Sequence, residues 1–591
     1  MVIRHGTTIC ESSHAPQSDT RIRIVAIGVA LVMFVIVYRL FTIMILQHDM
    51  YVALAAGSQD MYAQLYPVRG QIYVQDSRMT DRYPVAINRD VFTVYADTRQ
   101  IQSIDKAESI AEGLADVFHR DDEKKLAMFL QLNKRTDPYE PLEKEVEESV
   151  IQRLKEKNFA GIAWVRQAKR YYPEKDLTAQ VVGFVGKDQD GNDVGRYGVE
   201  GYWQKELAGT RGFIAGATSL AGKLITLAGG SKENPEDGAD IVLTIDRALQ
   251  FATCKALNEG AYEYGAETGA AIIMDPHTGA VRAMCSYPTF DPNTYNQVEN
   301  TAVYNNHVIF TPYEPGSVFK PITMAGAINE GVVTPDTSFY DTGERSGICQ
   351  KPIKNALLKA YEWQTMTGVL ENSINTGMVF VVEKLGKKKF LDYVERFGFG
   401  MKEGIQLDTE VTGTVASLSE NKGNDLDCYT ATGSFGQGLT ATPLQLATAF
   451  SAIANGGTLY RPYIVDIIEY TDGRVERTRP VSLGDVITER TARLVSAMMV
   501  RVIDSGQAKR AGVPGYYIAG KTGTAQISGV GGYSAQTNHT FVGFGPTDDA
   551  KFVMVVKFEK PDRPWADGTA APVFGKIAKF IMEYYHVPPV R

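Results

Sequence analysis

One apolar segment near the N-terminus limits how this chain can fold. Its residues, Ile24–Leu46, are almost wholly apolar, and Arg39 is their one charge. A helix of about 20 such residues crosses the roughly 30 Å hydrocarbon core of a bilayer. A cleaved signal peptide, with Ala53-Leu54-Ala55 as its processing site, is the alternative, but the segment is longer than the usual apolar core of such peptides. The sequence therefore predicts an uncleaved transmembrane anchor.

The basic residues around this segment predict its orientation. Arg4, Arg21 and Arg23 precede it, whereas no Lys or Arg occurs between Arg39 and Arg69. Because the more basic flank usually stays in the cytoplasm, we expect a single-pass protein with a cytoplasmic N-terminus and the remaining chain outside. Arg39 fits two interpretations, snorkelling to the nearer interface or contact with a partner helix.

Length and composition predict several regions. At 591 residues the chain is long enough for more than one domain. A net charge of −8 gives no global basic field of the kind that attracts nucleic acid. A Gly-, Asn- and Pro-rich stretch at 229–238 is typical of a boundary. The expected regions are a cytoplasmic tail (1–23), the anchor (24–46), a structural or docking pedestal (47–235) and a larger domain (236–591).

The larger domain has the pattern of an α+β fold. Asp246 can cap a helix after a first strand, and a turn at Asp275–Gly279 separates two apolar runs in the manner of a hairpin. We expect a mainly antiparallel sheet flanked by helices, with a helical insert. The expected elements are strands at 241–245, 270–274, 280–284, 541–544 and 551–558, and helices at 246–261, 443–454 and 573–584.

The pedestal has a mixed α/β pattern. Residues 91–96 alternate as a strand does, whereas 104–158 are rich in Lys and Glu and are predicted to be helical. The charge run Glu140–Glu148 is interpreted as a solvated helix face.

The five cysteines of the chain are far apart in sequence. This spacing argues against a disulfide scaffold, and no zinc-type Cys/His cluster occurs. We expect buried free thiols, with a single disulfide as the alternative in an oxidising compartment. The cysteines are Cys10, Cys254, Cys285, Cys349 and Cys428.

A serine three residues before a lysine, Ser317 and Lys320, is the main chemical signal. Residues three apart on a helix share one face, so a nucleophile and its base could meet there. A serine hydroxyl is a weak nucleophile until a base removes its proton. Lys320 can do this only when neutral, so its pKa must fall from about 10.4 to near 7 through burial or a neighbouring positive charge.

The same Ser-x-x-Lys pattern occurs at Ser103 to Lys106 and at Ser419 to Lys422, where a solvated helix face is the simpler interpretation. Only Ser317 follows Pro-Gly and opens an apolar segment that ends near Gly331. These boundary signals indicate a helix that begins at the serine.

Ser373 and Asn375 could assist Ser317. Ser373 could relay a proton between Lys320 and a leaving group. The Asn375 amide could donate to a substrate carbonyl and accept from a cation. A helix cap or a turn is the alternative role of this Ser-x-Asn pattern, which recurs at Ser419.

Lys521-Thr522-Gly523 occurs once in the chain and is followed by Thr524. Small residues on a strand allow a substrate backbone to pair alongside. Lys521 would attract a substrate carboxylate and help to keep Lys320 neutral, Thr522 would add a hydroxyl, and the N–H groups of Ser317 and Thr524 could form an oxyanion hole. A Gly-rich strand with a solvated lysine is the alternative.

Taken together, the three ordered motifs resemble those of class B penicillin-binding proteins. The middle motif has Ile374 rather than the Asp of class A β-lactamases. In the pedestal, Arg69-Gly70-Gln71-Ile72 and Gly198-Val199-Glu200-Gly201 are similar to that family, whereas Gln75-Asp76-Ser77-Arg78 departs from it. The resemblance covers nearly all of the chain after residue 24.

The resemblance implies a serine acyltransferase that cross-links peptidoglycan stem peptides ending in D-Ala-D-Ala and is a target of β-lactams. It implies catalytic roles for Ser317, Lys320, Ser373 and Asn375, and substrate-binding roles for Lys521, Thr522, Gly523 and Thr524, without metal or cofactor. It also implies a SEDS-type membrane glycosyltransferase and other divisome proteins as partners. The expected location is the bacterial cytoplasmic membrane, with most of the chain on the periplasmic or extracellular face.

Within the family, the segments Phe435–Gly438 and Ala570–Phe574 look most like those of the septal, cell-division transpeptidase, with the elongation enzyme as the rival. Two other classes stay open. A D,D-carboxypeptidase or β-lactamase would use the same nucleophile for hydrolysis, and a non-catalytic scaffold would use the fold to bind peptide.

Overall fold

A computed structural model gives the fold of most of the chain after the predicted anchor. It describes residues 60–78, 81–218, 224–225, 232–420, 426–529 and 532–591, together with 33, 34 and 37. The predicted anchor at 24–46 therefore lies outside the described residues, except for these last three. Within the described ranges no helix has both the length and the apolarity needed to cross a bilayer.

The chain divides into two compact units, of which the smaller lies within Met1–Pro67 and Thr210–Glu236. Its described part is a four-stranded sheet in the order β1-β8-β10, with β9 paired to β8. All its described pairs are antiparallel. The strands are β1 (Asp60–Leu65), β8 (Gly212–Thr218), β9 (Leu224–Ile225) and β10 (Lys232–Glu233).

The larger unit contains a seven-stranded sheet that joins distant parts of the sequence. Its order is β20-β19-β11-β2-β3-β4, with β5 also paired to β3. Strands from beyond residue 239 thus complete a sheet that the pedestal begins, and β11 runs parallel to β2. The strands are β2 (Ile72–Gln75), β3 (Arg82–Ala96), β4 (Glu140–Val146), β5 (Ile162–Tyr171), β11 (Asp240–Asp246), β19 (Val465–Glu469) and β20 (Val475–Arg477).

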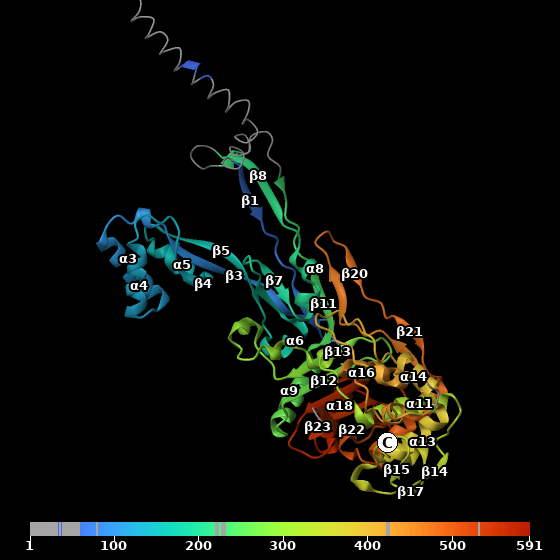
Figure 1. Ribbon diagram of the computed structural model, residues 1–591. Helices are drawn as coiled ribbons and strands as arrows, with labels where there is room; N and C mark the ends of the chain where they lie inside the picture. The colour runs from blue at the N-terminus through green and yellow to red at the C-terminus, as the bar shows by residue number, and fades with distance from the viewer. Residues whose placement is uncertain are drawn as a thin grey trace, which may run out of the picture. The chain divides into compact units, whose positions relative to one another are not determined.

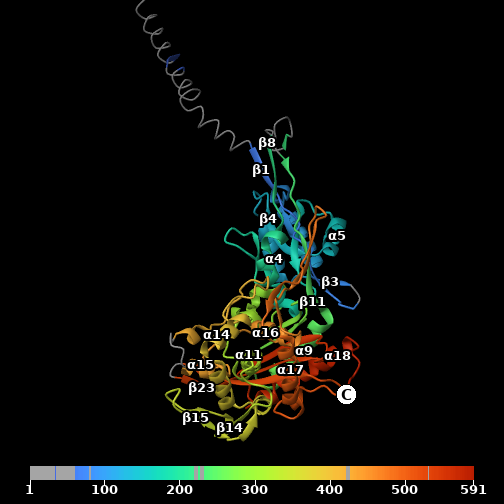
Figure 2. The same ribbon diagram turned by 90° about the vertical axis from the view of Figure 1, so that its right-hand side faces the viewer.

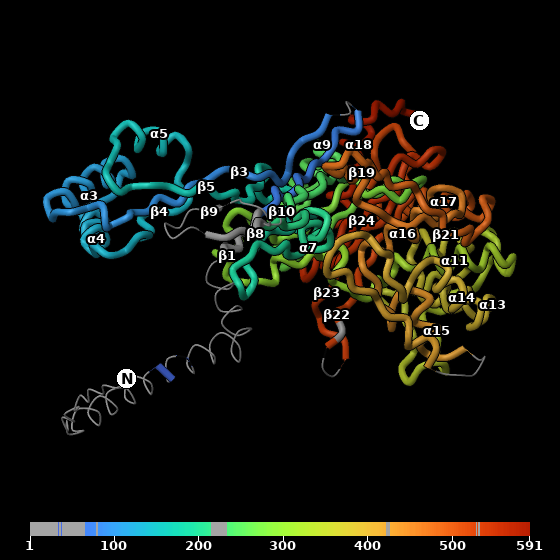
Figure 3. Tube along the Cα trace, turned by 90° about the horizontal axis from the view of Figure 1, so that it is seen from above, coloured from blue at the N-terminus to red at the C-terminus, as the bar shows by residue number. Residues whose placement is uncertain are grey.

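Three helices lie beside β3, β4 and β5, as Figure 3 shows: α3 (Ile104–Phe118), α4 (Asp122–Leu132) and α5 (Glu148–Lys157). The predicted helix over 104–158 is therefore interrupted, because residues 140–146 form strand β4. The charge run is therefore not a helix face, although Lys144, Glu145 and Glu147 are exposed; Glu140 is buried and pairs with Lys134. Pairing with the long strand β3 outweighed the local charge pattern.

A five-stranded antiparallel sheet forms the centre of the domain, in the order β13-β12-β24-β23-β22 (Figure 1). Its strands are β12 (Thr268–Met274), β13 (Val281–Tyr287), β22 (Ala519–Gly529), β23 (Gly532–Gly545) and β24 (Phe552–Glu559). The predicted hairpin at 270–284 and the strands near 541 and 551 lie here. With the flanking helices, this sheet confirms the predicted α+β fold.

Helices cover both faces of this sheet (Figures 1 and 2). On one face Phe541 lies against Phe574 of α18, at a ring-centroid distance of 4.5 Å. The opposite face bears Gly523, beside the segment that carries Ser317. Asp246 caps α9 through Ala248 and Leu249, as predicted. The longer helices are α9 (Arg247–Glu263), α11 (Lys320–Asn329), α16 (Pro443–Ala454), α17 (Glu489–Asp504) and α18 (Ala570–Tyr584).

An insert between α11 and α16 holds short strands and helices. Its elements are β14 (Ser338–Asp341), β15 (Glu344–Arg345), β16 (Ile353–Lys354), β17 (Glu362–Thr365), α12 (Met366–Glu371), α13 (Asn375–Leu385), α14 (Lys387–Arg396) and α15 (Cys428–Gly433). Shorter elements elsewhere in the unit are α6 (Ala179–Val182), β6 (Phe184–Lys187), β7 (Asp193–Arg196), α7 (Gly198–Tyr202), α8 (Gln204–Ala208), α10 (His307–Phe310), β18 (Thr458–Tyr460) and β21 (Ser482–Asp485).

Four of the cysteines form two disulfides, Cys254–Cys285 and Cys349–Cys428. The expectation of free thiols is therefore wrong. The partners are 31 and 79 residues apart in sequence, and only the tertiary fold brings them together. The first bridge joins α9 to β13, and the second joins the insert segment before β16 to the start of α15.

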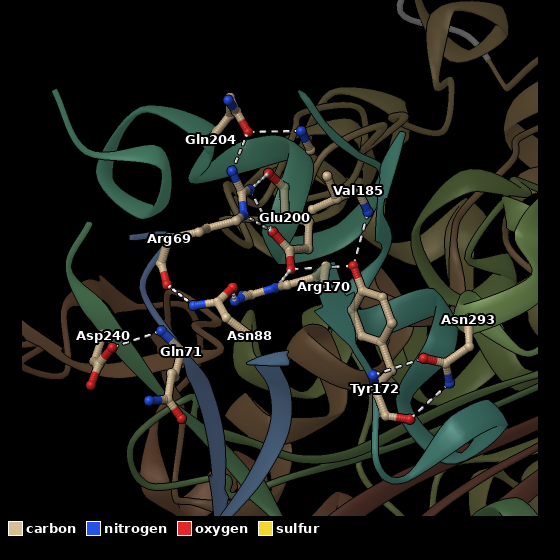
Figure 4. A network of polar contacts seen from close by, with 11 residues as sticks. Arg69, Gln71, Asn88, Arg170, Tyr172, Val185, Glu200, Gln204, Asp240 and Asn293 are labelled. Atoms are coloured by element: carbon tan, nitrogen blue, oxygen red, sulfur yellow. Dashed lines mark hydrogen bonds and ion pairs between the residues drawn. The ribbon is translucent and has the colours of Figure 1, made fainter. Parts of the chain in front are cut away.

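A buried ion-pair network supports the pedestal sheet (Figure 4). Glu200 is fully buried and accepts from Arg69 Nε at 2.8 Å and from Arg170 Nε at 2.7 Å. Burial alone would raise the pKa of Glu200, but the two guanidinium groups outweigh it and lower the pKa. The backbone of Tyr172 exchanges two hydrogen bonds with Asn293, both at 2.9 Å. The Arg69 and Glu200 motifs noted in the sequence therefore form one structural unit.

Candidate active site

Ser317 lies in a single 3-10 turn, Gly316–Phe319, that leads directly into α11. Gly316 has a φ of +59°, and its N–H donates to Gly436 O at 2.9 Å. A Cβ on Gly436 would lie 2.2 Å from Gly316 O, so both glycines permit this close approach. Pro321 lies in the first turn of α11, where a backbone N–H has no partner within the helix, so its missing donor costs nothing.

Lys320 is fully buried and points at the Ser-x-Asn motif. Its Nζ donates to Ser373 O at 2.6 Å, Ser373 Oγ at 3.1 Å and Asn375 Oδ1 at 2.8 Å. Ser373 takes a left-handed backbone conformation, with φ of +56°, which lets both its carbonyl and its hydroxyl face the lysine. Ser373 and Asn375, which lie 53 and 55 residues after Lys320 in the sequence, thus meet at its amine.

The surroundings of Lys320 favour its neutral form. Burial is the larger cause, and Lys521 is the second; together they lower the pKa of Lys320 well below its usual value. Lys521 is itself fully buried on β22, and burial lowers its pKa to about 7. A lysine with a depressed pKa can accept a proton from a hydroxyl near neutral pH.

Strand β22 lies directly against the serine turn. A Cβ on Gly523 would come within 2.8 Å of Pro315 O and 3.0 Å of a Val318 methyl group, so this position has room only for hydrogen. Thr522 is buried, and Lys521 Nζ contacts the carbonyl of Thr522 at 3.1 Å. The Thr524 hydroxyl accepts from Ala566 N at 3.1 Å.

The predicted site residues fall into two contacting groups. Lys320, Ser373 and Asn375 are joined by hydrogen bonds, and Lys521 to Thr524 follow one another along β22. Within the described residues no hydrogen bond joins the Ser317 hydroxyl to Lys320 Nζ. Ser317 is partly exposed at the start of its turn.

The other two Ser-x-x-Lys matches have ordinary structural roles. Ser103 caps α3, and its Oγ accepts from Lys106 N at 3.2 Å. The Ser419 hydroxyl donates to Ala416 O at 3.0 Å, and Lys422 lies outside the described residues.

Glu314 is a residue near the site that the sequence did not single out. Its Oε1 accepts from Gly438 N at 3.0 Å and from the Tyr533 hydroxyl at 3.2 Å, and burial raises its pKa. Glu314 therefore connects the loop 436–438 and strand β23 to the segment that carries Ser317. The only sequence signal was its position three residues before Ser317.

Asp341 and Asn355 are two further residues near the site that the sequence did not reveal. They lie 35 and 21 residues before Thr376 and hydrogen-bond to it beside Asn375. No short-range spacing links them to the motifs. Among the described residues there is also no group of three or more His, Cys, Asp or Glu side chains arranged to hold a metal ion.

The chain matches two protein families. Residues 269–579 match the family described as the penicillin binding protein transpeptidase domain. Residues 64–243 match the penicillin-binding protein dimerisation domain.

Curated relatives cover most of the chain. Stage V sporulation protein D of Bacillus subtilis is 31% identical over 573 residues, which are 95% of this chain and 85% of that protein. Peptidoglycan D,D-transpeptidase FtsI of Escherichia coli K12 is 28% identical over 539 residues, 88% of this chain and 85% of the relative.

Solved structures share the fold. Penicillin binding protein 2X of Streptococcus thermophilus superposes with a TM-score of 0.76 at 21% identity, covering 88% of this chain and 80% of that one. Penicillin binding protein 3 of Mycobacterium tuberculosis, complexed with aztreonam, gives a TM-score of 0.67 at 26% identity, covering 90% and 98%. The first likeness concerns the fold alone.

Proposed function

This chain belongs to the penicillin-binding proteins, the family of peptidoglycan D,D-transpeptidases, and from that membership we propose that Ser317 is its acylated nucleophile. The observation that carries the proposal is the convergence of Ser373 and Asn375 on the buried amine of Lys320, one turn from Ser317. The substrate is a stem peptide ending in D-Ala-D-Ala, and β-lactams compete for the same site.

The reaction has two transfers. Ser317 Oγ attacks the carbonyl carbon of the penultimate D-Ala while its proton passes to Lys320. The C–N bond to the terminal D-Ala breaks, and that residue leaves as a free amino acid after its nitrogen gains a proton. An amine of a second stem peptide then attacks the ester, which forms the cross-link and restores the Ser317 hydroxyl.

Lys320 acts as the base because its pKa is depressed. Burial and Lys521 disfavour its ammonium form, so the neutral amine is available near neutral pH. Ser373 passes the proton onward to the leaving nitrogen, and its 3.1 Å contact with Lys320 Nζ supports this role. Asn375 holds the Lys320 amine through its side-chain oxygen.

Residues of β22 bind the substrate in this proposal. Lys521, Thr522 and Thr524 hold the terminal carboxylate, and Gly523 lets the strand lie close to the serine turn. The N–H groups of Ser317 and Thr524 stabilise the oxyanion, each worth about 3–4 kcal/mol in the transition state. The position of β22 against Pro315 and Val318 supports this arrangement.

The wider setting follows from the sequence. We propose that Ile24–Leu46 anchors the protein in the bacterial cytoplasmic membrane, that residues 47–235 form the pedestal and that residues 236–591 carry the catalytic domain on the outer side. A SEDS-type glycosyltransferase and divisome proteins are the proposed partners. A septal role is favoured by the segments Phe435–Gly438 and Ala570–Phe574, with an elongation role as the rival. One relative is named for sporulation and another as a peptidoglycan D,D-transpeptidase, so the names of the relatives favour neither role.

Labelling of membranes with a fluorescent penicillin tests the central proposal. We expect a stable adduct on the wild-type protein and none on Ser317→Ala. The matched control is Ser103→Ala, which alters the same sequence pattern at a helix cap and should leave the adduct unchanged. Absence of an adduct on the wild type would contradict the proposal and favour a non-catalytic scaffold. An adduct that forms and rapidly disappears would favour a hydrolase.

A further inference from the structure

Four donors converge on one buried carboxyl group beside the catalytic motifs. Asp341 is fully buried at the end of β14. Its Oδ1 accepts from Gly343 N at 3.0 Å and Thr376 Oγ at 2.6 Å. Its Oδ2 accepts from Asn355 Nδ2 at 2.8 Å and Tyr361 N at 2.9 Å. An ionised carboxyl group can only accept hydrogen bonds, so four donors satisfy it. Asp341 thereby holds four parts of the insert together through one side chain.

Asn355 connects this carboxyl group to the start of α13. The residue before that helix, Ile374, has no side chain that could accept from its first N–H groups. Asn355 Oδ1 supplies the missing acceptor, taking bonds from Asn375 N at 3.0 Å and Thr376 N at 3.1 Å. Since Asn355 Nδ2 is held by Asp341, the amide of Asn355 can turn only its oxygen toward the helix.

The neighbouring residue, Lys354, sets the direction of the Asn375 amide. Asn375 Nδ2 donates to Lys354 O at 2.9 Å, and Asn375 Oδ1 accepts from Lys320 Nζ at 2.8 Å. Turning this amide by 180° would place its NH₂ at Lys320 Nζ, where it could bond only to the lone pair that the base needs, and would place two acceptors together at Lys354. Asn375 therefore presents its oxygen to Lys320 only while residues 354 and 355 keep their places.

We propose that Asp341 and Asn355 are positioning residues for the transfer reaction. They hold the Asn375 amide with its oxygen toward Lys320 and so keep the Lys320 amine aimed at the serine turn. They act through Asn375 rather than on the substrate. This inference rests on the proposed function, because it assumes that Lys320 serves as the base for Ser317.

Exchanging the two side chains tests the inference. In Asp341→Asn, the amide keeps a single acceptor oxygen, so its NH₂ must face either Asn355 Nδ2 and Tyr361 N or Gly343 N and Thr376 Oγ. In Asn355→Asp, two carboxylates would face each other. The double variant Asp341→Asn/Asn355→Asp restores a donor–acceptor pair between them and an oxygen toward the N–H groups of α13. The Tyr361 N–H group then lacks its acceptor, and Lys359 O lacks the donor that Asn355 Nδ2 supplies at 3.1 Å.

We expect each single variant to lower the acylation rate constant for a fluorescent penicillin by about 10- to 100-fold, the range for a misplaced catalytic group. The dissociation constant of the preceding non-covalent complex should change little, because the substrate contacts are intact. The double variant should recover part of the lost rate, as expected for residues that act through a shared contact.

Tyr340→Ala is the matched control. Tyr340 is the residue before Asp341, is 53% exposed and is paired with Trp363 of β17. Its substitution therefore alters the same strand without removing a group of the polar cluster. Its acylation rate should match the wild type. Thermal unfolding of each variant identifies loss of fold, and Thr376→Val, which removes only one donor to Asp341, replaces any variant that does not fold.

The possible outcomes are distinct. Wild-type acylation rates in folded Asp341→Asn and Asn355→Asp would overturn the inference and leave the proposed function standing. A double variant no faster than the slower single variant would also overturn it. Failure of the wild type to form an adduct would instead contradict the proposed function.

Discussion

At the scale of single residues, the burial of two lysines sets the chemistry. Lys320 and Lys521 are both fully buried, and their hydrogen bonds go to neutral oxygens of Ser373, Asn375 and Thr522. Lys557 offers a contrast, because burial lowers its pKa too but the carboxylate of Glu559, 3.4 Å away, opposes that shift. An amine without a nearby carboxylate is the one that can lose its proton near neutrality.

The pH dependence of acylation should report this arrangement. Lys320 must be neutral to act, so the rate falls on the acid side as Lys320 becomes protonated. Lys521→Ala removes the neighbouring positive charge, which raises the pKa of Lys320 and moves the acid limb of the profile to higher pH. Rates normalised to their plateau across pH 5–10 provide the measurement, which separates this shift from any loss of substrate binding.

The exposed residue Lys509 offers the control for that experiment. Lys509→Ala removes the same charge from an exposed side chain that is not among the contacts of Lys320, and it should leave the profile unmoved. An unshifted acid limb in Lys521→Ala would show that Lys521 does not influence Lys320.

At the scale of elements, the contact between β22 and the serine turn decides the shape of the site. Gly523 and Gly436 sit on two sides of the segment Pro315–Val318, and neither position has room for a side chain. Glycine occupies these two positions because a larger side chain would clash with the serine turn. The turn is held between a strand from near residue 523 and a loop from near residue 436, so the proposed nucleophile, Ser317, is placed by elements that are distant in sequence.

Gly523→Ala should disrupt this contact. The new methyl group would lie 2.8 Å from the Pro315 carbonyl oxygen. Because that oxygen belongs to the backbone, the backbone would have to move to relieve the clash. We expect acylation by a fluorescent penicillin to slow by about tenfold or more, since small displacements of reacting groups are costly. Gly529→Ala is the control on the same strand, because its nearest neighbour would be 3.8 Å away. Equal rates for the two variants would contradict this account of the strand.

At the scale of the molecule, the larger unit is held by contacts between residues that are far apart in the chain. Its seven-stranded sheet combines strands from residues 72–171 with strands from 240–477. Glu200 then joins Arg69 and Arg170, which precede and end the pedestal strands. The pedestal sheet and the catalytic region therefore share strands.

Glu200→Gln should destabilise this unit. Breaking a buried pair leaves Arg69 and Arg170 without their counter-charge, which costs about 3–5 kcal/mol in the free energy of unfolding. Because the pKa of Glu200 is lowered in the folded state, its contribution is present near neutral pH and is lost as pH falls through that folded-state pKa. The gap between variant and wild type should therefore narrow in acid. Urea unfolding at pH 7 and at pH 3–4 measures it.

The control for this prediction is Glu489→Gln. Glu489 pairs with Arg493 on an exposed helix face, with side-chain exposures of 69% and 72%. Exposed pairs of this kind contribute about 0–1 kcal/mol, so the free energy of unfolding of this variant should be close to that of the wild type. If Glu200→Gln also unfolded with nearly the wild-type free energy, the buried network would make no net contribution to stability.

Much of the catalytic domain could be predicted from the sequence alone. Apolar periodicity, the Asp246 cap and the turn at Asp275–Gly279 are local signals, and local signals set where strands and helices begin. The motif residues Ser317, Ser373 and Lys521 could be named because each lies within a short pattern. The interruption of 104–158 by β4 was missed, because pairing with β3 is a contact between distant residues.

Only the tertiary structure decided which distant residues meet. The pairing of four cysteines, the link from Glu200 to Arg69, and the placement of Asp341 and Asn355 at the start of α13 depend on chain crossings that no local pattern encodes. The sequence by itself determined the apolar segment Ile24–Leu46, the three ordered motifs and the α+β pattern. The fold determined that Lys320 is buried and that Lys521 influences its pKa, since burial is a property of packing around a residue and not of its neighbours in the chain.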